Sequence, residues 1–212
     1  MTASRKVKFT RMADGTVEDY ALLIEELPQV RAKVAGHALE MLDRLKGGYS
    51  IYQVSRYQHS LQSATLAYDD GADEELVVAA LLHDIGDIVA PDNHSAIAAE
   101  ILKPYVSDKT FWIVQQHGLF QGYYYFHHVG ADRNARDKHL GHAYYQACAD
   151  FCAKYDQAAF DPKFASKPVE FFEPMVRRVF ARRPFAASKA AKRDPMALDL
   201  GYGARAAAKR GA

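Results

Sequence analysis

The chain has 212 residues, 49% of them hydrophobic and 25% charged, which is the composition of a single globular domain with a sizeable core. Two cysteines cannot make the disulfide framework of a small secreted protein, and no apolar run approaches the ~20 residues of a membrane-spanning helix. The formal net charge is only +1, and the N-terminus lacks the apolar segment of a secretory signal, so we predict a soluble, cytoplasmic protein without a membrane partner.

The N-terminal part is predicted to become helical at Thr16, which forms a capping box with Asp19. Helical patterning runs from there to about Lys46, and Pro28 marks the place where the helix could break. Residues 1–48 are therefore expected to form an N-terminal helical extension that packs on the core.

A buried central helix is predicted next. An earlier helix begins near Ile51 and ends at the turn after Asp69. Asp73 is then a good N-cap, and residues 76–82 (LVVAALL) are apolar on every side. A helix that is apolar all round is buried, so this one should lie at the centre of the fold.

Further helices are predicted towards the C-terminus. They cover about residues 95–102, 107–117, 141–159 and 168–182, with an aromatic stretch at 120–128 before a polar loop. Pro174 should bend the last helix. No run alternates Val and Ile as a strand would, so the predicted fold class is all-α.

The charge is unevenly distributed along the chain. From Arg182 onward there are eight Lys/Arg and two Asp/Glu, out of totals of 27 and 26, so the body before it is acidic. An acidic body argues against binding a phosphate backbone, and we expect no nucleic-acid partner for the folded part. Residues 183–212 form a basic tail that we expect to be flexible, and that either contacts an anionic partner or is solvated.

The dipeptide His83-Asp84 is the most unusual feature, because it follows seven apolar residues into the predicted core. Ionisable groups that are buried there must be paired or must bind a metal, since burying them bare costs several kcal/mol. A structural interpretation, in which the aspartate caps a helix and the histidine is hydrogen-bonded, is the alternative for an isolated pair.

Other histidines favour the metal-site interpretation. His59 lies in the middle of a predicted helix, and His117 shares a face with the apolar Ile113 and Val114. His94 stands in the turn beyond the central helix, next to a helix start. Imidazoles together with a carboxylate suit iron, manganese or zinc.

A two-metal site also needs a bridging group and a second carboxylate. Asp84 is the natural bridge, and Asp150, Asp156 and Asp161 are the candidates for the second carboxylate. We choose Asp156, because it shares a helical face with the two cysteines four and eight residues before it, and cysteines usually pack inward.

The ordered set of candidate ligands resembles the HD-domain superfamily in its two-metal form. Residues 58–62 (QHSLQ) and 79–86 (AALLHDIG) are similar to the first two motifs of that superfamily. The resemblance implies an all-α helical bundle over residues 49–182 and a metal centre held by six side chains: His59, His83, Asp84, His94, His117 and Asp156.

Two branches of that superfamily share this ligand set, the metal phosphohydrolases and the mixed-valent di-iron oxygenases. Residues 111–120, and residues 151–156 with the helix after them, are similar to segments of myo-inositol oxygenase. Tyr49 stands ten residues before His59, where the phosphonate-cleaving oxygenases carry a tyrosine that caps one iron. That resemblance implies a catalytic role for Tyr49, although an aromatic residue packed over the core is the alternative.

The substrate-binding positions depart from those relatives. Asp87 stands where they carry a lysine or a histidine, and Phe160 replaces a second lysine. A negative Asp87 suits a cation or a hydroxyl donor, unless it is a turn residue or a partner of a ligand. We also predict substrate contacts for Gly118 and for His127, whose aromatic neighbourhood could instead be loop packing.

The predicted function is that of an oxygenase. It would use O2 and two iron ions in the Fe(II)/Fe(III) state to cleave a C–C or C–P bond of a small hydroxylated substrate, as the resemblance implies. The alternative is a phosphohydrolase that uses manganese or zinc and acts on a nucleotide or small phosphoester. A non-catalytic metal-binding protein is a third possibility, which the complete ligand set disfavours.

Overall fold

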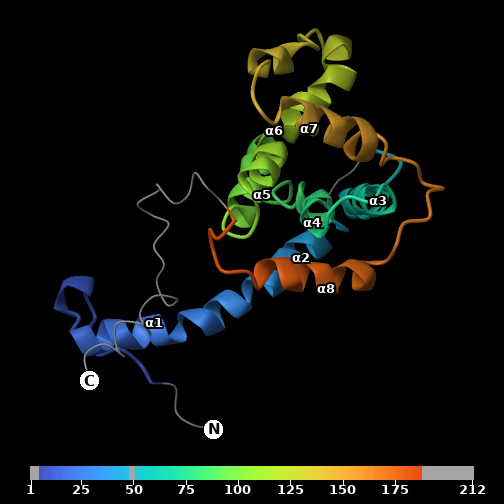
Figure 1. Ribbon diagram of the computed structural model, residues 1–212. Helices are drawn as coiled ribbons and strands as arrows, with labels where there is room; N and C mark the ends of the chain where they lie inside the picture. Colours follow the sequence, from blue (N-terminus) through green and yellow to red (C-terminus); the bar gives the residue numbers. More distant parts are fainter. Residues whose placement is uncertain (1–4, 48–50, 188–212) are drawn as a thin grey trace.

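The structure, a computed structural model, describes residues 5–47 and 51–187, and this part of the chain is all-helical (Figure 1). The α-helices are α1 (Val17–Ala32), α2 (Val34–Arg44), α3 (Arg56–Asp69), α4 (Glu74–Leu82), α5 (His94–Leu102), α6 (Asp108–Tyr125), α7 (Tyr145–Phe151) and α8 (Val169–Phe180). The predicted all-α fold class is therefore confirmed. Residues 188–212 of the predicted tail lie outside the described residues, and so does Tyr49.

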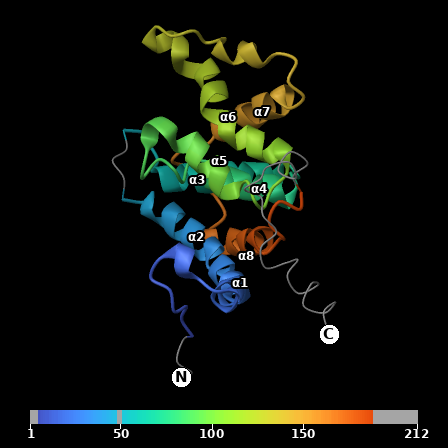
Figure 2. The same ribbon diagram turned by 90° about the vertical axis from the view of Figure 1, so that its left-hand side faces the viewer.

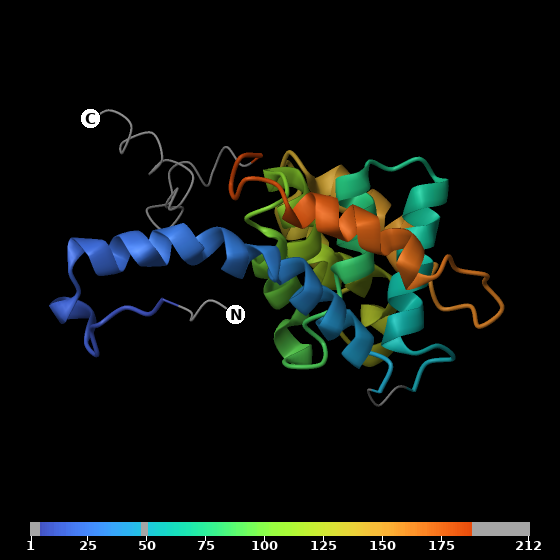
Figure 3. The same cartoon turned by 90° about the horizontal axis from the view of Figure 1, so that it is seen from below.

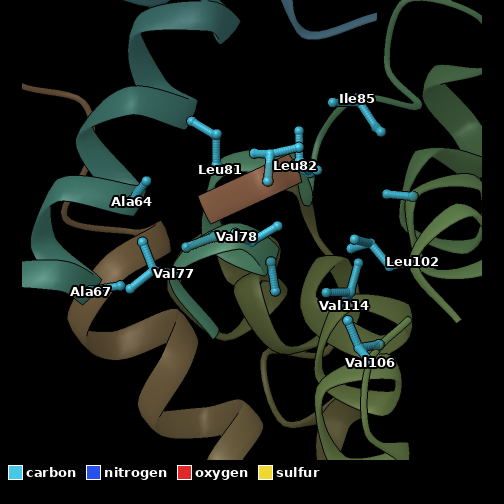
Figure 4. Close-up of a cluster of buried hydrophobic side chains, with 14 of the residues drawn as sticks. Ala64, Ala67, Val77, Val78, Leu81, Leu82, Ile85, Leu102, Val106 and Val114 are labelled. Atoms are coloured by element: carbon cyan, nitrogen blue, oxygen red, sulfur yellow. The ribbon is translucent and has the colours of Figure 1, made fainter. Parts of the chain in front are cut away.

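Helix α4 lies at the centre of the fold, as its apolar sequence predicts. The Asp73 side chain accepts a hydrogen bond from the Leu76 backbone N–H at 2.8 Å and begins the helix. Val78, Leu81 and Leu82 are fully buried, and Figure 4 shows α4 side chains between those of α3 on one side and those of α5 and α6 on the other. This packing fixes the end of α4, where His83 and Asp84 follow.

In Figure 2, helices α3, α4 and α5 lie between α6 and α7 on one side and α2 and α8 on the other. Helices α3 and α4 contact each other along their length, α5 packs on α6, and α8 covers α4 from the opposite side. Helix α3 begins at Ser55, whose side chain and Gln58 form a reciprocal capping box. The capping fixes the register of α3, which carries His59 one turn further on.

The N-terminal helical segment divides at Lys33, not at Pro28. Pro28 is not buried and stays inside α1, so water can solvate the carbonyl that lacks its helical partner. Helix α2 packs against α8 and α3, with Ala38 and Leu42 buried. Helix α1 projects beyond the bundle (Figure 3), and Asp19 is its one buried residue.

Two of the helices that follow the central one differ from their predicted lengths. Helix α6 continues to Tyr125, eight residues beyond the predicted end at His117. The predicted helix over residues 141–159 is instead the short α7 followed by a π-helical turn, Cys152–Asp156. Such turns interrupt α-helices at functional sites, and this one ends at a candidate ligand. In the described part of the chain, no helix is both long and apolar enough to cross a lipid bilayer.

Candidate metal centre

The six predicted ligands come together at one place, although they belong to five segments of the chain. Five of them are at most 3% exposed, and the side chain of His94 is 23% exposed. His59 lies in α3, His83 and Asp84 follow α4, His94 begins α5, His117 lies in α6 and Asp156 ends the π-helical turn. The helical bundle therefore brings residues that are far apart in the sequence into one cluster.

Each of the four imidazoles is oriented by a hydrogen bond from its Nδ1 to a backbone carbonyl oxygen. The acceptors are Ala159 for His59 at 3.0 Å, Ala80 for His83 at 2.8 Å, Pro91 for His94 at 2.7 Å and Val114 for His117 at 2.7 Å. A carbonyl can only accept, so Nδ1 carries the proton and the Nε2 lone pair of each neutral ring faces the cluster. Metal-binding histidines are usually fixed in this way.

The facing Nε2 atoms are placed so that they can share a cation. The Nε2 atoms of His59 and His83 lie 3.1 Å apart, and in the neutral rings both are acceptors. Asp156 places Oδ1 at 3.4 Å from His59 Nε2, while its buried Oδ2 has no hydrogen-bond partner. Buried polar atoms without partners are rare in folded proteins, and a metal ion would satisfy all three side chains.

Asp84 divides the cluster into two groups of ligands. Its Oδ2 lies 3.6 Å from Nε2 of both His59 and His83. Its Oδ1 lies 3.3 Å from His117 Nε2 and 3.5 Å from His94 Nε2. Atoms that bind one ion at about 2.0–2.2 Å lie roughly 3 to 3.5 Å from one another, so both groups have the right spacing. The arrangement fits two metal ions bridged by one carboxylate.

His83 lies close enough to belong to either group of ligands. Ligand atoms of His83, Asp84 and His117 also lie within 4.8 Å of one another, as do those of His59, His83 and Asp156. We place His83 with His59, because their Nε2 atoms are close and both face Oδ2 of Asp84. The second group is then Asp84 Oδ1, His94 and His117.

The electrostatics of the cluster favour cation binding. Burial lowers the pKa of His83 to about 4, so this imidazole is neutral near pH 7 and free to bind a metal. Burial by itself would raise the pKa of Asp84, but the imidazoles of His83 and His117 outweigh it and hold that pKa well below its usual value. The bridging carboxylate is therefore ionised.

His94 reaches the cluster because two glycines leave room for it. A Cβ on Gly86 would lie 2.5 Å from the His94 carbonyl oxygen, and a Cβ on Gly118 would lie 2.8 Å from Ser95 Oγ. Neither contact is tolerable without movement, so the start of α5 can approach both segments only where side chains are missing. Gly86 lies two residues after Asp84, so the segment that carries this ligand is also the one that makes room for His94.

A cavity of about 380 Å³ opens on the cluster. It is lined by ligand side chains (Asp84, His94, His117 and Asp156), four aromatic side chains (Tyr52, Tyr124, Tyr125 and Phe160), and Arg56, Gly118, Gln121 and Gln157. The volume is at the lower end of the range for small-molecule sites. Phe160 stacks on the His59 ring at 4.4 Å between centroids, so its side chain covers one of the candidate ligands.

The predicted substrate-binding residues lie in different places. Gly118 lines the cavity. Asp87 is not among the lining residues, and its carboxylate pairs with Arg56 Nε at 2.8 Å and lies 3.5 Å from His94 Nδ1. His127 packs on His128, away from the cavity lining. Their substrate contacts stay predictions from sequence, and so does the role of Tyr49, which lies outside the described residues.

Arg56 is the principal cavity residue that was not among the predicted site residues. It lines the cavity, and its Nη1 lies 3.1 Å from Oδ2 of Asp84. Its position three residues before His59, on the same helix, was the available signal, because side chains at that spacing share a face. Tyr124 and Tyr125 belong to the aromatic stretch for which the sequence left a pocket wall and loop packing open, and both line the cavity at the end of α6.

Comparison with known proteins agrees with the geometry. Residues 56–143 match the model of the HD domain family. The matched stretch contains all the candidate ligands except Asp156, which lies 13 residues beyond its end. No curated protein matches the chain significantly.

Proposed function

We propose, from the HD domain that residues 56–143 form, that this chain is a metal-dependent enzyme whose two metal ions are held by the six clustered side chains. An HD domain implies a metal-dependent enzyme of that type, and the clustered histidines and aspartates are the donors that such a site requires. We assign one metal to His59, His83 and Asp156, the other to His94 and His117, and the bridge to Asp84.

We further propose that the enzyme is a di-iron oxygenase acting on a small hydroxylated substrate. The observation that carries this choice is the state of Arg56, which is the one cationic side chain among the described residues that line the cavity. Its guanidinium already contacts Asp84 at 3.1 Å and Asp87 at 2.8 Å. Beside the metal ions, an unpaired side-chain cation would help to bind the oxygens of a phosphoester, and the described lining offers none.

Bound irons would supply activation of O2 and of the substrate hydroxyl, and the protein would supply geometry and a shielded cavity. The rings of Tyr52, Tyr124, Tyr125 and Phe160 form part of the wall and can help to exclude water from the substrate. Gln121 also lines the cavity, and its buried Oε1 has no partner, so it can accept a hydrogen bond from a substrate hydroxyl group. The similarity of residues 111–120 to inositol oxygenase supports the same choice.

A phosphohydrolase is the second candidate, because the same ligands would also hold manganese or zinc and activate water. In that case Arg56 would have to leave one carboxylate to reach a phosphate oxygen. The substrate would then be a nucleotide or a small phosphoester, and O2 would have no part in the reaction.

The test is anaerobic loading of the full chain with iron, followed by partial oxidation. An oxygenase should give the EPR signal of a spin-coupled Fe(II)/Fe(III) pair, and the signal should change when a substrate alcohol binds. Oxygen consumption that depends on an added alcohol would support the proposal further. Hydrolysis of a generic phosphoester with manganese or zinc, without any coupled iron signal, would instead establish the second candidate.

The ligand assignment makes a separate prediction. Asp156→Ala should reduce the metal content by about one ion per chain, because it removes a buried carboxylate that faces His59. Asp150→Ala is the matched control, since Asp150 is exposed and accepts a hydrogen bond from Gln146 on the surface of α7. Elemental analysis of both variants checks this, and metal loss in the control alone would refute the choice of Asp156.

Tyr49 is proposed as a catalytic residue on the resemblance alone. Tyr49→Phe should alter the substrate or oxygen kinetics and leave the metal content unchanged, because the proposed role is to cap a metal and not to retain it. Unchanged kinetics would leave Tyr49 as a packing residue.

A further inference from the structure

Arg56 and Asp87 form a connected pair behind the bridging carboxylate. Arg56 Nη1 donates to Asp84 Oδ2 at 3.1 Å, and Arg56 Nε pairs with Asp87 Oδ2 at 2.8 Å. The guanidinium also lies 5.0 Å from the centroid of the Tyr52 ring. One planar group is therefore held by two carboxylates and an aromatic ring, which leaves the arginine one orientation.

Through Asp87, the pair also reaches His94 in the second group of ligands. Oδ1 of Asp87 lies 3.5 Å from Nδ1 of His94, and that nitrogen donates its proton to the Pro91 carbonyl oxygen at 2.7 Å. The Asp87 side chain is 13% exposed and the Arg56 side chain 29% exposed, so both interactions are partly shielded from water. The chain of contacts runs from Asp84 through Arg56 and Asp87 to His94.

We propose that Arg56 and Asp87 are positioning residues that fix the bridging carboxylate and His94, and thereby complete the second metal position. This inference rests on the two-metal site proposed above, but not on the choice of reaction. We call these two residues the Arg56–Asp87 clamp. Its role differs from the substrate contact that the sequence suggested for Asp87.

The clamp determines which metal position each carboxylate oxygen of Asp84 faces. A hydrogen bond to Oδ2 fixes the rotation of the carboxylate, so that Oδ1 stays turned towards His94 and His117. Without it, both oxygens could bind the metal held by His59 and His83, and the second position would lose its share of the bridge. The second position is the more sensitive of the two, because it has three protein donors and the first has four.

The test is titration of the metal-free full chain with manganese(II) alone, with free manganese followed by EPR. The wild type should bind two ions per chain in a stronger and a weaker step. Arg56→Gln and Asp87→Asn should each weaken the weaker step about 10- to 100-fold, which is the usual effect of losing the partner of a metal ligand. The stronger step should change by less than about threefold.

The double variant distinguishes a clamp from two unrelated effects. If the two side chains act as one unit, Arg56→Gln with Asp87→Asn should weaken the second step no more than the more severe single change. Arg56→Lys is the conservative variant, because it keeps the positive charge beside the two carboxylates and should disturb folding less. A lysine cannot hold both carboxylates at once, so this variant should still weaken the second step. The exchange coupling in the EPR spectrum of the two-manganese form should decrease in each variant that retains both ions.

Matched controls come from a surface ion pair of the same chemistry. Arg177 contacts Glu173 on α8, away from the cavity, so Arg177→Lys and Glu173→Gln should leave both binding steps unchanged. Two unchanged steps in the Arg56 and Asp87 variants would overturn the clamp alone. A wild type that binds a single ion would overturn the clamp and the two-metal site together, whereas phosphoester hydrolysis by a two-metal protein would leave the clamp intact.

Discussion

Helices α4 and α1 differ strongly in how much of each helix is buried. Helix α4 has nine residues, six of them buried, whereas α1 has sixteen residues and buries only Asp19. Val17 and Val30 of α1 are 82% and 61% exposed, while α4 packs against α3, α6 and α8. The candidate metal centre lies at the end of the buried helix, where close packing leaves its ligands little freedom to move. Stability and metal geometry should therefore depend on α4 and hardly at all on α1.

The largest expected difference concerns one leucine on each helix. Leu82→Ala on α4 should lower the free energy of unfolding by about 2 to 5 kcal/mol, because it leaves a cavity in a close-packed core. Leu23→Ala on α1 should change it by less than about 0.5 kcal/mol, because Leu23 is already 40% exposed. Chemical denaturation of both variants measures the difference. Equal losses would show that α1 has a buried partner and that the comparison is wrong.

Two glycine variants should change the free energy of unfolding by smaller amounts, and in opposite directions from each other. Gly86→Ala would place a Cβ 2.5 Å from the His94 carbonyl oxygen, a backbone atom, and should cost about 1 to 3 kcal/mol and weaken binding of the second metal. Gly36→Ala is the control in α2, where a Cβ meets nothing within 4 Å. Because alanine is the better helix former, this change should stabilise the protein by roughly 0.5 to 1 kcal/mol. Thermal and chemical unfolding, with metal analysis, test both variants.

Metal binding at the buried end of α4 should also depend on pH. Burial lowers the pKa of His59 and of His117, but Asp156 and Asp84 respectively outweigh it, so each pKa in the metal-free protein is raised above its ordinary value of 6.5. A raised pKa means that a proton must leave before the metal binds, so affinity should fall as the pH falls through these pKa values. The expected slope is about tenfold per pH unit for each displaced proton. Manganese titrations between about pH 6 and 8 would show it, and a flat profile would contradict the assignment of these imidazoles as ligands.

The sequence predicted the features that depend on local pattern. Asp73 as an N-cap, the buried run before His83 and the inward face of His117 all follow from capping and periodicity, which need no knowledge of the rest of the fold. Asp156 was also chosen by helical phase. Asp156 is buried with both cysteines despite the π-helical turn, because four residues return nearly to the same face in either geometry.

The sequence could not predict features that depend on contacts between segments. The pairing of Arg56 with Asp84 joins residues 28 positions apart, and no periodicity reports it. The break of the N-terminal helix was placed at Pro28 because a proline is a strong local signal, but a solvated proline is tolerated and the chain turns at Lys33 instead. The length of α6 was underestimated because its aromatic residues are weak helix formers that tertiary packing can override.

The central claim is that one carboxylate divides its two oxygens between two metal positions. The most direct measurement is anomalous X-ray scattering from crystals of the full chain grown with iron or manganese. We expect two peaks, one beside His59, His83 and Asp156 and one beside His94 and His117, with Asp84 between them. A single peak, or two peaks with Asp84 bound to only one of them, would contradict it.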